Sequence, residues 1–383
     1  MPSVRARRDV FLFKPKVRLG ELSDVATTMN MTTPAPRDLS LPQWWPASRG
    51  AVSAPPEASG ESLARKIGYL RLSVTRGCSM RCTYCRPDFD RGHDPAAFDA
   101  NDVRFLVGHL HERFSLRKVR ITGGEPTTRR DLPEIIAAVR DTGIADLAMT
   151  TNALTLRRDA ARLRDAGLGR LNVSLDSLDA ERFAVLTGVD GLSRVLDGID
   201  VAMGLGFEAI KLNTVVVAGQ NEQDLPGLIA FAAARGLPIR LIELMPMGPL
   251  AESWARRYVS AERMRAALSE TVSRWVRDQA SDGGVSVTDA ARMWTAYFRD
   301  GSTARVGFIS PMSQHFCDTC DRLRITADGD IYPCLMDVPR GSLRDAVVKR
   351  NRTAIDTAID AAYAGKQVVH PAIAPGIMTH LGG

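Results

Sequence analysis

The chain has 383 residues, of which 45% are apolar and 25% charged, and its formal net charge is +6. These values predict a large hydrophobic core organised as one domain or one and a half. No apolar run approaches the roughly 18 residues that a membrane-spanning helix requires, and the early apolar run at residues 10–13 is too short for a secretory signal. We therefore expect a soluble, cytoplasmic protein without a membrane partner. The modest charge lacks interleaved aromatic residues, which disfavours nucleic-acid binding but allows local basic sites for a small anion.

The first 62 residues differ in composition from the rest of the chain. They contain six prolines between residues 34 and 56, begin with a basic stretch, and show no sustained helical or strand period. This pattern predicts a flexible N-terminal extension over residues 1–62. A transit peptide is the alternative interpretation, but Asp9, Glu21 and Asp24 interrupt the arginine-rich start.

From residue 69 onward, short β-rich runs alternate with segments of helical character. The β-rich runs cover residues 69–74, 118–122, 146–151, 170–175, 209–217 and 239–245. Helical segments such as 131–143 and 224–236 have apolar residues at helical spacing, an Asp at the start and a Gly at the end. Six such units predict an α/β protein with a parallel sheet. The pattern alone does not choose between a doubly wound sheet and part of a barrel.

Polar or glycine-rich pieces lie at the carboxyl ends of these predicted strands. CSMRCTYC (78–85) follows the first strand, GGEP (123–126) follows the second, and TTN (150–152) ends the third. The remaining three strands contribute Ser174 with Asp176, Asn213, and Glu243 with Met245. In barrels and open α/β sheets this edge is where catalytic residues gather. The sequence therefore predicts one site built from six strands.

All six cysteines fall in two groups of three, Cys78, Cys82, Cys85 and Cys317, Cys320, Cys334. Such clustering indicates metal binding more than disulfides. Three thiolates do not complete a tetrahedral zinc site or a four-iron cluster, so each group needs a further ligand. The turn ADGD (327–330) predicts a hairpin that returns Cys334 to the other two cysteines of its group. The alternative for the first group is a zinc loop, which would need a fourth ligand, a His or Asp, from a distant part of the chain. His93 is the only histidine near this loop in the sequence.

These motifs together resemble those of the radical S-adenosylmethionine (SAM) enzymes and, among them, the MoaA-type GTP 3′,8-cyclases of molybdenum-cofactor biosynthesis. The CxxxCxxC spacing and GGEP resemble the first two motifs, and FCDTCDRLRITADGDIYPC (316–334) resembles the motif of a second cluster. Further matches are YLRLSVT, VRITGGEP, LNVSLDSLDAERF, KLNTVV, LIELMP and the terminal Gly-Gly. The resemblance extends from about residue 65 to the carboxyl end.

The resemblance implies a fold, cofactors and site residues. The implied fold is an incomplete (β/α)6 TIM-type barrel at residues 63–280, followed by a C-terminal second-cluster region with the Gly-Gly tail at 281–383. The implied cofactors are two [4Fe-4S] clusters, one on each cysteine group, and SAM on the open iron of the first. Implied SAM contacts are Tyr84, Gly124, Ser174 and Met245. Implied GTP contacts, mainly with the triphosphate, are Arg71, Arg120, Thr150, Lys211, Arg322 and Arg324. Catalytic roles are implied for Arg71, Arg322, Arg324, Gly382 and Gly383.

The resemblance also implies a reaction, that of a lyase. Reductive cleavage of SAM gives a 5′-deoxyadenosyl radical that removes the 3′ hydrogen of GTP, which leads to 3′,8-cyclo-7,8-dihydro-GTP. The implied partners are GTP, an electron donor and a cyclic pyranopterin monophosphate synthase that receives the product, and a homodimer is compatible with the family. The alternative is another radical SAM enzyme with an auxiliary cluster, acting on peptide or RNA. Peptide-modifying enzymes typically have more cysteines, and RNA binding needs a broad basic face.

Three positions depart from the common pattern of this family. Ser79 stands where Asn usually follows the first cysteine, Ala153 replaces the Gly after TTN, and Asp321 follows Cys320 in place of Asn. None removes a thiolate or a cation, so we expect them to adjust loop geometry or the contacts around the ligands and not to abolish activity. Asp321 adds negative charge beside a site for a triphosphate unless an Arg neutralises it.

Overall fold

The computed structural model describes residues 67–85, 97–278, 290–364 and 366. The predicted N-terminal extension (1–62), His93 and the terminal glycines Gly382 and Gly383 lie outside the described residues. The described strands form one sheet of 11 strands, in the order β11-β10-β1-β2-β3-β4-β5-β6-β9-β8-β7.

Six parallel strands in chain order form the centre of this sheet. They are β1 (Tyr69–Ser73), β2 (Lys118–Thr122), β3 (Asp146–Thr151), β4 (Arg170–Ser174), β5 (Ala209–Val216) and β6 (Ile239–Glu243). Each confirms a strand predicted from the sequence. Two further strands extend the parallel set, because β10 (Arg322–Ile325) pairs with β1 and β9 (Thr303–Ile309) pairs with β6. The two ends of the sheet do not pair within the described residues, so the barrel is incomplete, as predicted.

The C-terminal region supplies the remaining strands. β7 (Val272–Arg277) and β8 (Ala291–Phe298) continue the sheet antiparallel from β9. β11 (Ile331–Tyr332) pairs antiparallel with β10, and the Gly329 N–H donates to Thr326 O at 3.0 Å in the turn between them. This confirms the predicted ADGD hairpin. Strands from both predicted regions, 63–280 and 281–383, thus belong to the same sheet.

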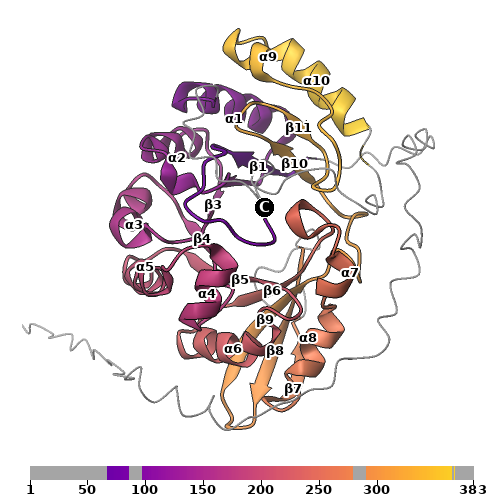
Figure 1. Ribbon diagram of the computed structural model, residues 1–383. Helices are drawn as coiled ribbons and strands as arrows, with labels where there is room; N and C mark the ends of the chain where they lie inside the picture. Colours follow the sequence, from indigo (N-terminus) through magenta and orange to yellow (C-terminus); the bar gives the residue numbers. More distant parts are fainter. Residues whose placement is uncertain (1–66, 86–96, 279–289, 365, 367–383) are drawn as a thin grey trace, which may run out of the picture. The chain divides into compact units, whose positions relative to one another are not determined.

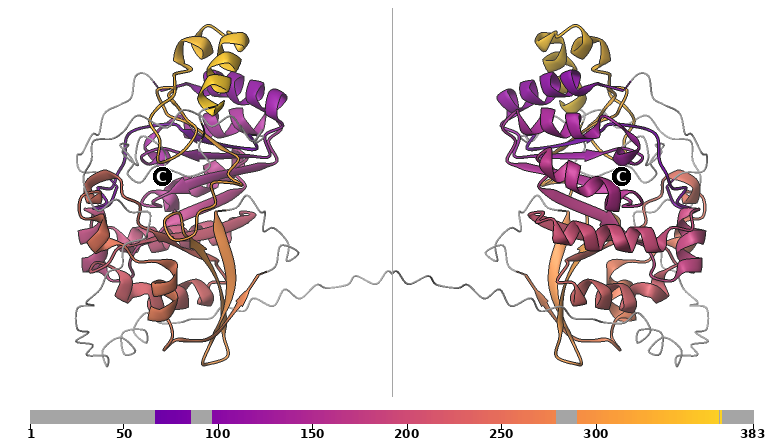
Figure 2. Two further views of the ribbon diagram at one scale, coloured as in Figure 1. Left: turned by 90° about the vertical axis from the view of Figure 1, so that its right-hand side faces the viewer. Right: turned by 90° about the vertical axis from the view of Figure 1, so that its left-hand side faces the viewer.

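Helices accompany the strands along the chain. They are α1 (Ala100–Phe114), η2 (Pro126–Thr128), α2 (Leu132–Arg140), α3 (Leu156–Asp165), α4 (Ala180–Thr187), α5 (Leu192–Gly204), η3 (Glu222–Asp224), α6 (Leu225–Ala234), η4 (Gly248–Leu250), α7 (Trp254–Arg257), α8 (Ala261–Ala267), α9 (Arg344–Val348) and α10 (Arg352–Ala364). Figure 1 shows α1 to α6 along the outside of the curved sheet, and Figure 2 shows the same layering from two sides. Helices α9 and α10 lie beside α1, where Arg113 pairs with Asp360 at 2.7 Å. No helix in the described ranges combines the length and apolar character needed to cross a membrane.

The Asp residues expected at the helix starts hold the predicted positions but do not cap. Asp131 precedes α2 and Asp224 precedes α6, yet neither side chain accepts from its helix. Asp131 binds Arg129 at 2.5 Å, and Asp224 binds Ser177 and Arg182. Tertiary partners have therefore taken the two carboxylates from the helix ends.

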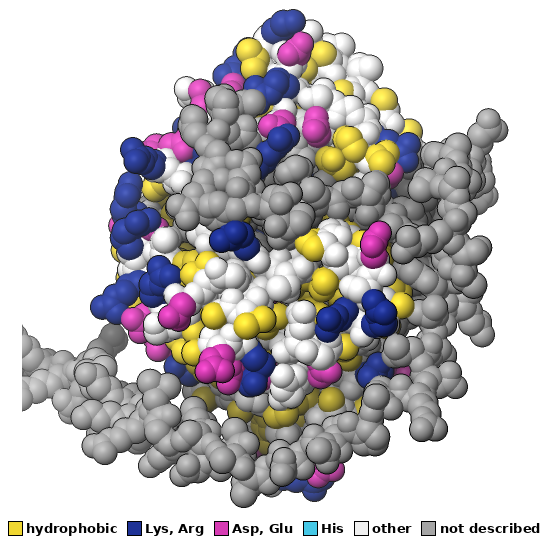
Figure 3. Space-filling view, in the orientation of Figure 1, with side chains coloured by type: hydrophobic (Ala, Val, Ile, Leu, Met, Phe, Trp, Pro, Cys, Tyr) yellow, Lys and Arg dark blue, Asp and Glu magenta, His cyan; other side chains and the backbone are white. Residues whose placement is uncertain are grey.

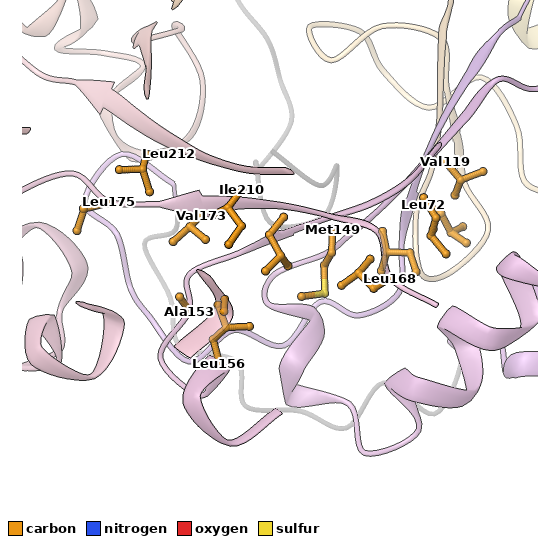
Figure 4. Close-up of a cluster of buried hydrophobic side chains, with 14 of the residues drawn as sticks. Leu72, Val119, Met149, Ala153, Leu156, Leu168, Val173, Leu175, Ile210 and Leu212 are labelled. Atoms are coloured by element: carbon orange, nitrogen blue, oxygen red, sulfur yellow. The ribbon is translucent and has the colours of Figure 1, made fainter. Parts of the chain in front are cut away.

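Strand alternation separates an apolar face from a polar one. Along β5, Ile210, Leu212 and Val216 are buried, whereas Lys211 and Asn213 alternate with them and are partly exposed. Figure 4 shows members of the apolar cluster side by side, including Leu72, Val119, Met149, Val173 and Leu212. Because consecutive strand residues point to opposite faces, every second residue is left to line the other side of the sheet.

Candidate active site

The polar face of the parallel strands borders a cavity of about 280 Å³. All six cysteines line this cavity, although 232 residues separate Cys85 from Cys317 along the chain. The structure thus brings together the two cysteine groups that the sequence placed far apart.

The first cysteine group lies in the loop that follows β1. Main-chain bonds fix this loop on the end of α4, where the N–H groups of Arg81 and Thr83 donate to Thr187 O (2.7 Å) and Leu186 O (2.9 Å). Burial raises the pKa of the Cys82 thiol well above its usual range, and the neighbouring Cys85 raises it further. Crowded buried thiols ionise readily when a metal supplies positive charge. This donor set therefore suits a metal cluster.

The predicted SAM contacts lie beside the first group. Tyr84 and Met245 pack in one apolar cluster with Cys82 and Cys85, and Ser174 and Gly124 border the same cavity. The Tyr84 hydroxyl donates to Asp176 at 2.6 Å, and burial raises the pKa of Asp176 to about 6. An apolar wall with a few fixed polar groups is the usual composition of a small-molecule site. The residues present fit an adenosyl ligand.

The glycines of GGEP pack directly against the cysteine loop. The Gly124 N–H donates to Thr75 O at 2.8 Å, and a Cβ on Gly124 would lie 2.6 Å from Arg76 O. Glu125 is buried behind them and accepts from Asn152 N (2.6 Å) and Thr151 Oγ1 (2.8 Å). The glycines are therefore needed for close approach of two loops, and Glu125 ties these loops to β3.

Two of the three unusual positions belong to this contact region. The Asn152 amide donates to Ser79 Oγ at 3.0 Å, which links the cysteine loop to the end of β3. Ala153 follows with φ of 61°, in the left-handed region that favours glycine, and its side chain is fully buried. Ser79 thus joins two loops through its hydroxyl group, and Ala153 holds a strained backbone.

The second cysteine group surrounds the start of β10. Burial opposes ionisation of Cys320, but Lys366 and Arg322 outweigh it and lower its pKa. Burial raises the pKa of Cys334, and the negative charge of Cys320 raises it further. Both thiols therefore lie close together and close to cations.

Asp321 is directed away from the cavity. Its carboxylate accepts from Arg117 Nη2 at 2.6 Å, and the structure does not place it among the cavity residues. The expected neutralising Arg is present, but it comes from the connection that precedes β2 and not from the adjacent hairpin. Gly68 makes room for this pair, because a Cβ there would lie 2.6 Å from Asp321 Oδ2.

Glu243, expected at the edge of β6, anchors a loop and does not line the cavity. It is 1% exposed and accepts from the N–H groups of Ala261 (2.9 Å), Met312 (3.0 Å) and Ser313 (2.9 Å). The loop that it holds leads from β9 to Cys317. Glu243 thereby fixes the approach to the second cysteine group.

The strand register aligns cations in two rows. Arg71 lies opposite Arg324 of β10 on one side and Arg120 of β2 on the other. Two residues earlier, Tyr69 lies between Arg322 and Lys118 in the same way. Like charges in opposite positions destabilise a sheet. A polyanion bound in the cavity would offset this repulsion.

The electrostatics of the two rows agree with such a ligand. Burial lowers the pKa of Arg324 to about 10, with a contribution from Arg322. Burial, followed by the charge of Arg324, likewise lowers the pKa of Arg71 well below its usual range. Shifts of this kind show that the positive charges are poorly solvated where they stand. They fit a phosphate-binding site.

Five of the six predicted GTP contacts line the cavity, and the sixth lies next to it. Lys211 borders a small adjoining hollow, and Arg120 and Arg240 line both spaces. The Thr150 hydroxyl and Arg120 Nε are buried and make no hydrogen bond within the described residues. Buried polar atoms of this kind usually find a partner, so they suit contacts with a bound ligand.

Four residues of this region were not predicted: Tyr69, Lys118, Arg240 and Lys366. Lys118 begins an apolar strand and Arg240 interrupts another, and a charge within a buried strand is a usable signal of a functional position. Tyr69 has the sequence pattern of an ordinary strand aromatic. Lys366 carries no such signal. Its ammonium donates to Arg322 O at 2.7 Å, a contact between segments 44 residues apart.

The outer surface contrasts with the cavity. Figure 3 shows Lys and Arg side chains along the edge formed by α2, α3 and α5, with Asp and Glu among them. Several form exposed pairs, such as Arg157 with Asp197 (3.0 Å) and Arg140 with Asp141 (2.7 Å). Exposed pairs of this kind contribute little to stability. In the cavity, by contrast, cations face cations.

The described side chains offer thiols as the possible metal ligands of the cavity. In the ranges that the structure describes, no three His, Cys, Asp or Glu side chains converge enough to hold a single ion. A four-iron cluster does not need such convergence, since each thiolate binds a different iron. Two groups of three half-buried thiols therefore fit two clusters.

Comparisons with known proteins agree with the fold and the motifs. Residues 72–232 match the family model of the radical SAM superfamily, and residues 237–371 match the model described as Molybdenum Cofactor Synthesis C. In fold, the chain is similar to Streptococcus suis SuiB bound to its precursor peptide SuiA, with a TM-score of 0.55, 15% identity, and coverage of 79% of this chain and 66% of that chain. The SAM-bound structure of SuiB gives a TM-score of 0.54, 15% identity and coverage of 79% and 68%. At this identity the likeness shows the fold alone.

Relatives of similar sequence indicate which family within the superfamily the chain belongs to. A GTP 3′,8-cyclase of Klebsiella pneumoniae is 38% identical over an alignment of 320 residues, with coverage of 81% of this chain and 93% of the relative. The GTP 3′,8-cyclase of Pectobacterium atrosepticum is 40% identical over 288 residues, covering 74% and 85%, and that of Marinobacter nauticus is 41% identical over 283 residues, covering 72% and 81%. The chain therefore belongs to the GTP 3′,8-cyclase family of radical SAM proteins.

Proposed function

We propose that the protein is a GTP 3′,8-cyclase of the lyase class, which converts GTP to 3′,8-cyclo-7,8-dihydro-GTP in molybdenum-cofactor biosynthesis. One observation carries the proposal: both cysteine groups and four of the five cations in the two rows line the same cavity. A radical SAM site needs the first cysteine group, and a triphosphate needs the cations.

Each cysteine group is proposed to hold a [4Fe-4S] cluster with one open iron. Cys78, Cys82 and Cys85 would hold the cluster that binds SAM, with Tyr84, Gly124, Ser174 and Met245 around the adenosyl group. Cys317, Cys320 and Cys334 would hold the cluster that faces the guanine base. When bound, the first cluster would supply the electron for cleavage of SAM, and SAM would supply the adenosyl group that accepts the 3′ hydrogen of GTP.

The chain's own residues bind and orient the nucleotide. Arg71, Arg322 and Arg324 are proposed to hold the triphosphate in a catalytically required position, with Arg120, Thr150 and Lys211 as further contacts. A hydrogen bond to a charged group contributes about 1.5–3 kcal/mol, so loss of one of these contacts is expected to weaken binding about 10- to 100-fold. Orientation matters because the 3′ carbon must meet the adenosyl group at short range.

Arg240 and Lys118 extend the same cationic surface. Arg240 donates to Asn172 Oδ1 at 3.1 Å, and Lys118 pairs with Asp146 at 3.0 Å. Both border the hollow that also contains Lys211. We assign them to the phosphate end of the nucleotide, where they add charge beside the two rows.

Several expectations follow from the reaction and not from the described residues. Reductive cleavage requires an electron donor, and the product passes to a cyclic pyranopterin monophosphate synthase. The role of Gly382 and Gly383 in turnover, a homodimer and a cytoplasmic location stay predictions.

The test is product formation by cluster-reconstituted protein. Protein reduced under anaerobic conditions is incubated with SAM and GTP, and the nucleotides are separated by chromatography. The wild type is expected to form 5′-deoxyadenosine together with a new isomer of GTP. Cys78→Ala should form neither. Cys334→Ala should still form 5′-deoxyadenosine but no nucleotide product, because only its second cluster is damaged.

Two outcomes would contradict different parts of the proposal. Nucleotide product from Cys334→Ala would contradict the second-cluster assignment. SAM cleavage by the wild type that leaves GTP unchanged would contradict GTP as the substrate and favour a different radical SAM activity.

A further inference from the structure

Tyr69 is a buried phenol whose hydroxyl group makes no hydrogen bond within the described residues. The side chain begins β1, is 8% exposed and lines the cavity. Tyrosine hydroxyls that are buried in proteins usually have a hydrogen-bond partner. The missing partner is therefore expected from a ligand of the cavity.

The surroundings of Tyr69 are cationic on both sides of β1. Lys118 Nζ lies 5.4 Å from the ring centroid, and the guanidinium carbons of Arg120 and Arg322 lie at 5.6 Å and 5.7 Å. Burial would raise the pKa of Tyr69, but Arg120, Arg71 and the other nearby cations outweigh it and lower the pKa. The hydroxyl therefore lies in a strongly positive field.

The chemistry of these neighbours determines what the hydroxyl can do. Arginine and lysine side chains only donate hydrogen bonds, so the cations cannot accept the phenolic hydrogen. An acceptor drawn to this position must be compatible with several positive charges. An anionic oxygen meets both requirements, and a phosphate oxygen is the one that the proposed substrate carries.

We propose that the Tyr69 hydroxyl donates a hydrogen bond to a phosphate oxygen of the bound nucleotide, which makes Tyr69 a determinant of specificity for phosphorylated substrates. The inference rests on the proposed function, since that function supplies the nucleotide. It adds a neutral donor to a set of cations. Unlike an Arg or Lys, this donor contributes directionality without further repulsion among the cations.

Tyr69→Phe isolates the proposed contact. The substitution removes one oxygen and keeps the ring that packs among the cations, so the variant is expected to fold. Equilibrium dialysis with cluster-reconstituted protein, SAM and no reductant measures nucleotide binding without turnover. We expect the Kd for GTP to rise about 10- to 100-fold, the range for loss of a bond to a charged group. The Kd for guanosine, which has no phosphate, should stay unchanged.

Tyr258→Phe is the matched control. Tyr258 packs on Trp254 with ring centroids 4.8 Å apart, outside the cavity, and burial and Glu243 raise its pKa. Its phenol thus has anionic surroundings where Tyr69 has cationic ones. GTP binding should be the same in Tyr258→Phe and in the wild type.

Two outcomes would overturn the inference. An unchanged Kd for GTP in Tyr69→Phe would exclude the hydrogen bond. An equal loss of GTP and guanosine binding would show that Tyr69 only shapes the site. Binding of inorganic tripolyphosphate distinguishes failure of the Tyr69 inference from failure of the proposed function. If the wild type binds tripolyphosphate and Tyr69→Phe binds it more weakly, the phosphate contact stands even where GTP is not converted.

Discussion

Gly124→Ala tests the close packing between the GGEP loop and the first cysteine loop. A Cβ at this position would lie 2.6 Å from Arg76 O and 2.7 Å from the Gly77 carbonyl carbon, and closer still to Gly77 O. Real Cβ atoms essentially never approach other atoms within 3.0 Å. The loops must therefore separate by at least about 0.7 Å at Gly77 O, and the displaced backbone immediately precedes Cys78.

The cost of this separation can be bounded. Overpacking a tight contact costs about 1–3 kcal/mol. The movement also strains two main-chain bonds, from Gly124 N to Thr75 O and from Glu125 N to Gly77 O, both 2.8 Å, each of which contributes about 1 kcal/mol. We expect Gly124→Ala to lower the free energy of unfolding by about 2–4 kcal/mol. Displacement of Cys78 should also reduce the iron bound by the first group.

Urea unfolding of the cluster-free protein measures the change in the free energy of unfolding. Iron content after reconstitution measures the loss of iron from the first cysteine group. Gly227→Ala is the control, because this glycine lies inside α6 with its nearest neighbour, Leu178 Cδ1, at 4.0 Å. Replacing a helical glycine with alanine stabilises by up to about 1 kcal/mol. If Gly124→Ala unfolded at the wild-type urea concentration and kept full iron and SAM cleavage, the close-packing argument would be wrong.

Three further changes test other parts of the site. Glu243→Gln puts an amide among N–H donors of the loop before Cys317, so urea unfolding should show a loss of about 2–3 kcal/mol; wild-type stability would show that the loop does not depend on the carboxylate. Ala153→Gly relieves a left-handed backbone, worth about 1–2 kcal/mol, but loses a buried methyl group and adds chain entropy, about 1–2 kcal/mol together. Its thermal unfolding should shift little, and a large loss would mean that the site is not strained. Alkaline pH should weaken GTP binding in the wild type more than in Tyr69→Phe, because cations lower the pKa of Tyr69 and the phenolate repels phosphate. Parallel pH profiles would contradict this reasoning.

Local patterns in the sequence were sufficient for the central strands. The run at 118–122 and the run at 146–151 coincide with β2 and β3, because apolar alternation and flanking turns are local signals. The cysteine spacing and the ADGD turn likewise predicted the β10–β11 hairpin of the second cysteine group. A resemblance to a family was needed to connect these pieces into one site.

Other features depend on contacts that no local pattern encodes. β10 pairs with β1 across some 250 residues of chain, and this pairing creates both cation rows. The partner of Asp321 is Arg117, in the connection that precedes β2, and the carboxylates of Asp131 and Asp224 bind side chains in place of the helix ends. Tyr69 looked like an ordinary strand aromatic until the register placed it between Arg322 and Lys118.

The most direct test of the central claim follows one hydrogen atom. GTP that carries deuterium at the 3′ carbon is incubated with SAM and the reduced, cluster-reconstituted protein, and the 5′-deoxyadenosine is analysed by mass spectrometry. The proposed cyclase transfers the label, so the 5′-deoxyadenosine should contain one deuterium while a cyclised nucleotide accumulates. Unlabelled 5′-deoxyadenosine together with unchanged GTP would contradict the proposal.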